Sequence, residues 1–206
     1  MFGIINYLGF VGSSVMLNIT PGSDTIYILT RSAVGGKKEG IVSAMGICTG
    51  ILIHTVLASL GLSAILASSK TAFNVMKLAG AAYLAIMGLI TLFSKKAIIT
   101  SEDKEKKPLT RIFRQGVLTN ALNPKVALFF LALLPQFVSP DNQCGPLPFL
   151  ILSLTFFTTS SLWCTFVAFV ASFVSKLLNS DPRISKTATK ITGIIYIILG
   201  LNVLIG

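Results

Sequence analysis

Charged side chains are scarce in this chain. Only 12% of its 206 residues are charged, whereas about 25% is usual for a soluble domain. Too few polar groups remain to cover a water-facing surface, which excludes an ordinary soluble fold. The apolar residues form long runs, and the mean hydropathy is +0.81. The sequence therefore predicts an integral membrane protein.

Signatures of catalysis and of cofactor binding are also missing. The chain has one histidine, and its three cysteines (Cys48, Cys144 and Cys164) are widely spaced, which indicates neither a metal site nor a disulfide framework. We find no nucleophile with a neighbouring base, no phosphate-binding loop and no nucleotide motif. We therefore expect no enzyme, no cofactor and no direct use of ATP.

Six apolar runs divide the sequence, each near or above the roughly 20 residues that a helix needs to cross the hydrocarbon core. They cover residues 3–30, 41–68, 72–94, 115–138, 147–174 and 189–206. Strands of a membrane barrel would alternate in character over about ten residues, which these runs do not. The first run has no lysine or arginine before its apolar core, unlike a signal peptide. We predict an all-α integral membrane protein with six transmembrane helices.

Basic residues are concentrated in the segments that follow the first, third and fifth runs. These segments hold fourteen of the seventeen lysines and arginines. These fourteen are Arg31, Lys37, Lys38, Lys95, Lys96, Lys104, Lys106, Lys107, Arg111, Arg114, Lys176, Arg183, Lys186 and Lys190. Because cytoplasmic loops are enriched in lysine and arginine, we expect these loops in the cytoplasm and both termini outside. Orientation thus explains the net charge of +10, and we expect no nucleic-acid partner.

The two halves of the chain resemble each other. Residues 77–89 (KLAGAAYLAIMGL) and 190–201 (KITGIIYIILGL) share lysine, glycine and tyrosine at equal spacing, so Tyr83 corresponds to Tyr196. We predict one transmembrane domain over residues 1–206, with repeat one at about 1–94, a cytoplasmic linker at about 95–110 and repeat two at about 111–206. Because each repeat has three helices, the two are inverted in the membrane, as in many secondary transporters.

A proline interrupts the first run and another interrupts the fourth. Proline inside a helix removes an N–H donor and clashes with the preceding turn, so we predict broken helices at Pro21 and Pro124. Proline also suits the first position of a new helix after a capping residue, and Thr20–Pro21 and Asn123–Pro124 both fit this pattern. The free N–H groups of each new half-helix are expected to attract a carboxylate.

Two ionisable residues, Asp24 and Lys125, follow these breaks closely. An ionisable side chain inside a span is costly and usually faces a partner or a wet cavity. Because Lys125 begins a half-helix, where a cation is disfavoured, we expect an anion beside it, either Asp24 or a ligand carboxylate. A purely structural pair is the alternative. The predicted substrate-binding or coupling residues are Asp24, Lys125, Asn123, Pro21, Gly22, Pro124, Asn18, Asn120 and Thr20, although capping of the broken ends also explains the three asparagines.

Weaker candidates are Ser23, His54, Tyr83 and Tyr196. His54, the only histidine, suits either a proton relay or a hydrogen bond between helices. The two tyrosines are expected to pack between helices, with possible hydroxyl contacts to the site. Gly46 and Gly50 form a G-x-x-x-G pattern, which predicts a close helix contact either within the chain or in a possible homodimer.

Together these motifs resemble the LysE/RhtB family of amino-acid exporters over essentially the full chain. The matching segments are PGSD (21–24), TRS (30–32), GGKKEG (35–40), GAAYL (80–84), LNPK (122–125), FF (129–130) and LPQF (134–137). The resemblance implies efflux of amino acids or their derivatives across a bacterial cytoplasmic membrane, driven by the proton motive force. Ser23 stands where the family has a second proline, so the break depends on Pro21 and Gly22 alone.

These features give a mechanistic hypothesis. The ammonium of a zwitterionic amino acid meets Asp24, its carboxylate meets Lys125 and the N–H groups after Pro21 or Pro124, and proton exchange at Asp24 couples transport to the gradient. No other acidic residue is evident in the spans, so we expect a small neutral substrate such as threonine or homoserine. The alternatives are export of a metal cation or another small solute, a membrane-embedded enzyme and a non-transporting scaffold.

Overall fold

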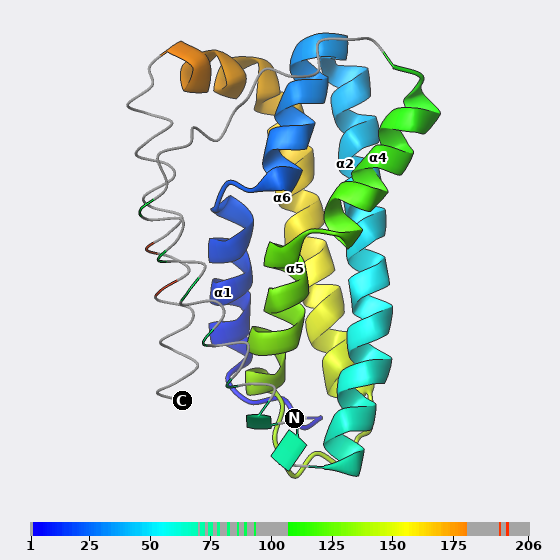
Figure 1. Cartoon of the computed structure of the whole chain (residues 1–206), viewed down its shortest axis with the longest axis vertical. Helices are drawn as coiled ribbons and strands as arrows, with labels where there is room; N and C mark the ends of the chain where they lie inside the picture. The colour runs from blue at the N-terminus through cyan, green and yellow to red at the C-terminus, as the bar shows by residue number, and fades with distance from the viewer. Residues whose placement is uncertain are drawn as a thin grey trace.

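The computed structural model describes residues 2–69 and 107–180, with side chains as far as residue 171, and scattered positions between 71 and 93 and at 194 and 197. The regular elements of the described residues are all helical (Figure 1). They are α1 (Tyr7–Ile19), α2 (Ser23–Ser68), α4 (Leu109–Ala121), α5 (Pro124–Leu128), the π-helical η1 (Phe129–Leu133), the 3-10 helix η2 (Leu134–Phe137) and α6 (Leu147–Ser180). Most of the predicted helices 72–94 and 189–206, with Tyr83 and Tyr196, and linker residues 95–106 lie outside the described residues.

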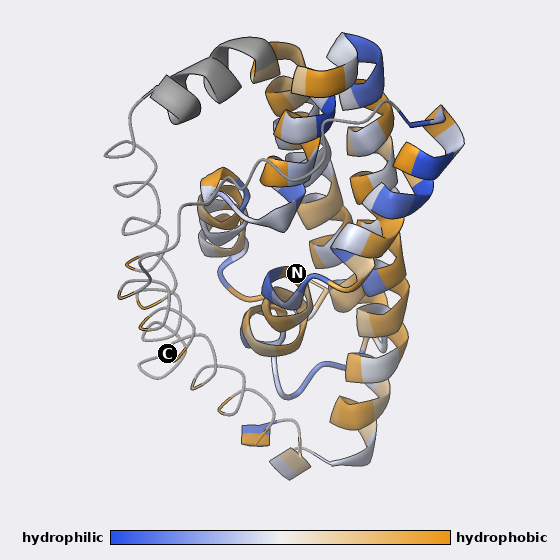
Figure 2. Ribbon diagram, turned by 45° about the horizontal axis from the view of Figure 1, so that its top comes forward, coloured by the Kyte–Doolittle hydropathy of each residue, from blue (hydrophilic) through white to orange (hydrophobic). Residues whose placement is uncertain are grey.

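Several helices are long and apolar enough to cross a membrane. Ser23–Ser68 and Leu147–Ala171 qualify singly, and the bent pair Leu109–Ala121 with Pro124–Phe137 can form one further span. Figure 2 shows apolar residues along most of the helix shafts, and hydrophilic residues around the start of α4 and the neighbouring turn of α2. The described residues thus confirm a helical membrane protein. They do not by themselves establish six spans.

Helix α2 contains two helical arms joined at Gly36. A straight helix of 46 residues would be about 69 Å long, roughly twice the hydrocarbon thickness. Gly36 interrupts it with φ 72° and ψ −166°, a conformation open to glycine because it has no Cβ atom. In Figure 1 the two arms lie side by side and the chain reverses between them. The first arm completes the first apolar run, and the second arm contains the next run.

Both predicted helix breaks are present. Between α1 and α2 the chain leaves the helix from Thr20 to Gly22, and between α4 and α5 it does so at Leu122 and Asn123. The second break bends its helix pair by 42°. Helix α4 begins at Leu109, before the predicted start of its span at residue 115, because an amphipathic turn precedes the apolar run.

The two broken spans lie side by side in opposite directions. Three pairings set their register: Ile4 forms an antiparallel bridge with Val138, Lys125 Nζ donates to the Thr20 carbonyl, and the Tyr27 hydroxyl donates to the Ile112 carbonyl. Residue numbers rise along one span as they fall along the other. The two breaks therefore meet near the middle of the bundle.

Small residues allow α2 and α4 to cross closely. A Cβ atom on Gly46 would clash with the Phe113 carbonyl oxygen, and one on Gly50 would lie 2.6 Å from Asn120 Cβ. A Cβ atom on Gly116 would in turn lie 3.1 Å from the Gly46 Cα. The close contact predicted from G-x-x-x-G is confirmed, and it lies within the chain. The motif is therefore no evidence for a dimer interface.

Two hydrophobic clusters fill the interior of the described bundle. The first is rich in aromatic side chains and includes Phe10, Leu17, Ile51, Val126, Phe129, Phe130, Phe137 and Phe156. The second lies toward the Gly36 turn and consists of Ile28, Leu29, Ala44, Ile47, Cys164, Val167, Ala168 and Ala171. Stacking of Phe129 on Phe156, with ring centroids 4.4 Å apart, ties the broken second span to α6 in the first cluster.

Candidate functional site

The Lys125 side chain crosses from the second break to the first. Its Nζ donates a 2.6 Å hydrogen bond to the Thr20 carbonyl, at the end of α1. Gly22 lies close to this side chain, because a Cβ atom on Gly22 would be 3.2 Å from Lys125 Cδ. The end of a helix carries partial negative charge, so α1 stabilises the ammonium that the start of α5 disfavours.

Asp24, in the first turn of α2, is held by its neighbours. The Asn120 amide donates to Asp24 Oδ2 at 2.8 Å, and the Ser23 hydroxyl lies 3.5 Å from Oδ1. The Asp24 carboxylate and the Lys125 ammonium attract each other, but they form no direct ion pair. Two opposite charges therefore lie where the two breaks meet, without a direct ion pair between them.

The second break has the predicted cap and the first does not. Asn123 Oδ1 accepts a 3.0 Å hydrogen bond from the Lys125 backbone N–H, with Pro124 at the first helical position, as expected. The prediction that Thr20 caps the half-helix after Pro21 was wrong. The Thr20 hydroxyl instead donates back to the Met16 carbonyl at 2.7 Å, and Gly22 begins α2 without a side-chain cap. The first turn of α2 thus keeps N–H groups that no side chain caps.

Asn18 links α1 to α6. Its amide donates to Thr159 Oγ1 at 3.2 Å, and its carbonyl accepts from the Ser160 hydroxyl at 2.7 Å. The side chain therefore joins two helices at the site and does not cap the broken end.

Asn120 connects the site to the only histidine. Its side chain is fully buried, and its backbone carbonyl lies 3.1 Å from His54 Nε2. Because a carbonyl only accepts, Nε2 carries the proton in this contact. The His54 ring also stacks on Phe130, with centroids 5.6 Å apart. Of the two predicted roles for His54, the hydrogen bond between helices is confirmed.

A small cavity of about 20 Å³ lies where these groups meet. Its polar lining residues are Asn18, Asp24, Thr25, Lys125 and Ser160, and its mainly apolar lining residues are Leu17, Ile47, Ile51, Val126, Phe156, Trp163 and Cys164. This volume holds about one water molecule and is far below the roughly 300 Å³ of small-molecule pockets. The lining includes residues of both hydrophobic clusters, so the cavity lies between them.

The predicted residues take different positions around this cavity. Asp24, Lys125 and Asn18 line it directly, whereas Asn120, Asn123, Thr20, Gly22 and Ser23 hold or adjoin the two charged side chains. Pro21 and Pro124 belong to the breaks themselves, and His54 contacts the site through Asn120. Tyr83 and Tyr196 lie outside the described residues.

Helix α6 also contributes to the cavity, and no motif in the sequence predicts this. Phe156, Ser160 and Trp163 of this helix line the cavity, and the buried indole N–H of Trp163 makes no hydrogen bond with any described residue. Most buried polar groups in proteins are paired, so such a donor beside a cavity suits a ligand acceptor. One signal was available in the sequence, because Trp163 is the only tryptophan of the chain.

The amino-acid sequence is similar to those of known membrane translocators. The family described as LysE type translocator matches residues 15–206. An uncharacterized membrane protein of Bacillus subtilis, YrhP, is 30% identical over 204 residues, covering 95% of this chain and 96% of the relative. The leucine efflux protein of Klebsiella pneumoniae is 26% identical, and that of Salmonella typhimurium is 24% identical. Each of these two alignments covers 95% of this chain and 93% of the relative. No solved structure matches the chain.

Proposed function

The chain belongs to the LysE type translocator family, and from its site we propose that it exports a neutral amino acid with an apolar side chain across the bacterial cytoplasmic membrane. As a member of a translocator family with amino-acid exporters among its relatives, it is a membrane transporter and not an enzyme. We propose in addition the specific substrate, the driving force and the number of spans.

One observation carries the proposal: opposite charges line one small cavity without forming a direct ion pair. An amino-acid zwitterion has the complementary charges at adjacent carbon atoms. In the proposed binding mode its ammonium lies at Asp24, which Asn120 orients. Its carboxylate lies at Lys125, with the uncapped first turn of α2 and the Trp163 indole as further donors.

The remaining wall of the cavity favours an apolar side chain. Ile47, Ile51 and Phe156 provide hydrocarbon and aromatic surface in the same cavity as the charged groups. We therefore favour a leucine-like substrate over the threonine or homoserine that the sequence suggested. The leucine efflux proteins among the relatives support this choice. A metal cation fits less well, because Asp24 is the only acidic side chain among the described lining residues.

The transport cycle that we propose uses two inverted repeats of three helices. The antiparallel register of the two broken spans supports this arrangement. The basic turn of α2 at Gly36 and the basic start of α4 face the cytoplasm, and both termini lie outside. In this cycle, relative motion of the repeats widens the cavity and exposes it to each side of the membrane in turn. Proton exchange at Asp24 couples the cycle to the proton motive force.

Efflux from cells loaded with a mixture of dipeptides tests the function, because intracellular hydrolysis raises many amino acids at once. We expect selective export of leucine-like amino acids by the wild-type protein, and its loss in Asp24→Asn and Lys125→Met at equal expression. Asp141→Asn and Lys38→Met remove the same charges at exposed positions and serve as matched controls.

Each other result has a distinct meaning. Unchanged export in both site variants would make the two charges structural. Full pH-dependent efflux by Asp24→Asn would contradict its role in coupling. If the wild-type protein exports no amino acid, the proposed function is wrong.

A further inference from the structure

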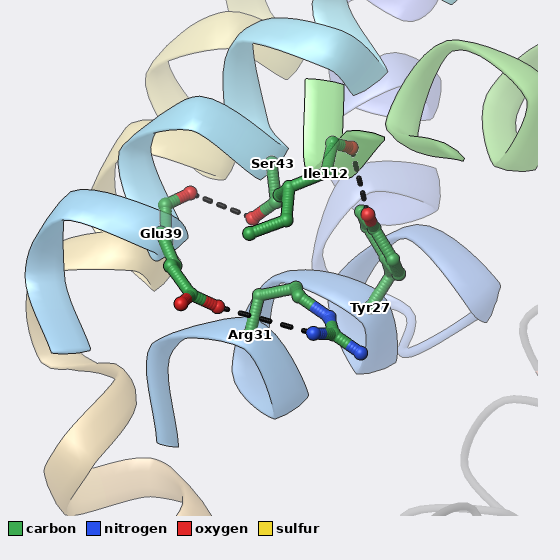
Figure 3. Close-up of polar contacts among 6 residues, drawn as sticks. Tyr27, Arg31, Glu39, Ser43 and Ile112 are labelled. Atoms are coloured by element: carbon green, nitrogen blue, oxygen red, sulfur yellow. Dashed lines mark hydrogen bonds and ion pairs between the residues drawn. The ribbon is translucent and has the colours of Figure 1, made fainter. Parts of the chain in front are cut away.

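An ion pair lies deep in the bundle beside the Gly36 turn, away from the cavity. Arg31 NH1 and Glu39 Oε2 are 3.9 Å apart, with side chains only 1% and 10% exposed (Figure 3). From the sequence, Arg31 is expected to be one of the loop charges that orient the protein. The structure corrects this, because Arg31 lies within the first arm of α2, is buried and faces Glu39 of the second arm.

Arg31 and the site residue Asp24 share one helical arm. They are seven residues apart, about two helical turns, so both side chains leave the same face about 10 Å apart along the axis. Tyr27 lies between them and donates to the Ile112 carbonyl of α4 at 2.7 Å (Figure 3). The arm that carries Asp24 is therefore fixed to α4 by Tyr27 and to the second arm of α2 by Arg31.

The turn between the arms has the features of a hinge. Gly36 has a positive φ and nothing within 4 Å of a Cβ position, whereas at Gly35 a Cβ atom would clash with the Glu39 carboxyl group. A Cβ atom on Gly40 would clash with the Ser32 hydroxyl. Glycines thus allow the arms to close tightly while Gly36 remains free of side-chain contact. Hinges commonly consist of a few such residues at element ends.

The ion pair is poorly built for stability alone. Removing two charges from water is expensive, and only close geometry with additional hydrogen bonds offsets the cost. Here the separation is long for a buried pair, and Glu39 Oε2 accepts no hydrogen bond from any residue that the structure describes. On the Glu39 side the contact is therefore not locked by a short hydrogen bond, which suits a contact that opens during the cycle. It is also placed at the basic end of the bundle, where the substrate enters in the proposed orientation.

We propose that the Arg31–Glu39 pair is the cytoplasmic gate of the transporter, and this inference rests on the proposed function. Separation of the pair lets the first arm of α2 pivot at Gly36. The pivot moves Asp24 and opens a path between the second hydrophobic cluster and α4 to the cavity. In the open state the Arg31 guanidinium faces this path and attracts the substrate carboxylate toward the site.

Access to Cys164 from the cytoplasmic side tests this gate directly, because Cys164 is buried and lines the cavity. Cys48→Ser and Cys144→Ser leave it as the only thiol of the chain. In inside-out membrane vesicles, a membrane-impermeant cationic methanethiosulfonate reagent should label it slowly. We expect Glu39→Gln to raise the labelling rate by at least about tenfold, which corresponds to about 1.4 kcal/mol. The exchange Arg31→Glu with Glu39→Arg should restore slow labelling.

The control is Lys38→Gln, which removes a charge at an exposed position of the same turn and should leave labelling unchanged. Glu39→Asp keeps the charge but shortens the side chain, so an intermediate rate is expected; this variant also serves if Glu39→Gln does not fold. An unchanged rate in a folded Glu39 variant, or an equal rise in Lys38→Gln, would overturn the gate. Because labelling needs no amino-acid export, a failed gate and a failed transport function give different results.

Discussion

Gly50 controls whether Asn120 reaches Asp24, which makes Gly50→Ala a sharp test of the site. The added methyl carbon would lie 2.6 Å from Asn120 Cβ and 2.9 Å from the Val117 carbonyl oxygen. Ordinary carbon contacts are about 3.5–4.0 Å, so α2 and α4 must separate by about 1 Å. The added methyl group meets Asn120 itself, and a shift of the Asn120 side chain by about 1 Å would break the 2.8 Å hydrogen bond that it donates to Asp24.

Two measurable effects follow from this separation. Overpacking of a tight interior typically costs about 1–3 kcal/mol. For a chain of this length each kcal/mol lowers the melting temperature by about 2–4 °C. Export should fall further than stability, because a misplacement of about 1 Å near a site can cost about 100-fold in rate. The assays are thermal unfolding of the detergent-solubilised protein and leucine efflux at equal expression.

Gly61→Ala is the matched control for this variant. Gly61 belongs to the same arm of α2, and a Cβ atom there would meet nothing within 4 Å. This substitution should be neutral or stabilise the helix, since alanine is favoured over glycine by about 1 kcal/mol. If Gly50→Ala were as stable and as active as Gly61→Ala, the close crossing and its role in holding Asn120 would be refuted.

Two further predictions concern His54 and Cys164. His54→Phe removes a donor to the Asn120 carbonyl, which still accepts from the Asn123 N–H, so we expect a loss of about 1 kcal/mol in stability and an unchanged pH profile of export. A flattened pH profile would instead identify His54 as a proton relay. In single-cysteine variants of the resting protein, a bulky maleimide should label the exposed Cys144 rapidly and Cys164 hardly at all, because the cavity holds only about 20 Å³. Rapid labelling of Cys164 without substrate would show that the cavity is not closed.

Much of the candidate site was predictable because its parts follow local rules of the chain. Pro21 and Pro124 break their helices wherever they are packed, since proline removes a backbone donor. Asp24 and Lys125 lie inside apolar runs, where ionisable side chains are costly and therefore indicate a functional site in any fold. The cap at Asn123 also follows from its immediate neighbour, Pro124. Thr20 also precedes a proline but does not cap the next helix, because its hydroxyl donates to the Met16 carbonyl of the preceding turn.

Contacts between distant segments could not be predicted in the same way. Nothing near Lys125 in the sequence indicates that its ammonium binds the Thr20 carbonyl. Arg31 looked like a loop charge because it follows an apolar run, and only the fold of the α2 arms shows it buried against Glu39. The α6 residues Ser160 and Trp163 carry no motif that assigns them to the cavity.

The sequence by itself determined a helical membrane protein, the positions of its breaks and two charges inside its spans. These properties depend on hydrophobicity and backbone chemistry, which act over a few neighbouring residues. Only the packing of the helices shows that the two breaks meet in antiparallel register, that Asp24 and Lys125 line one cavity, and that Arg31 faces Glu39 across the Gly36 turn. Those relations depend on how closely helices far apart in the chain can approach. Gly46 and Gly116 face each other and Gly50 faces Asn120, and the missing Cβ atoms of these glycines allow the close approach.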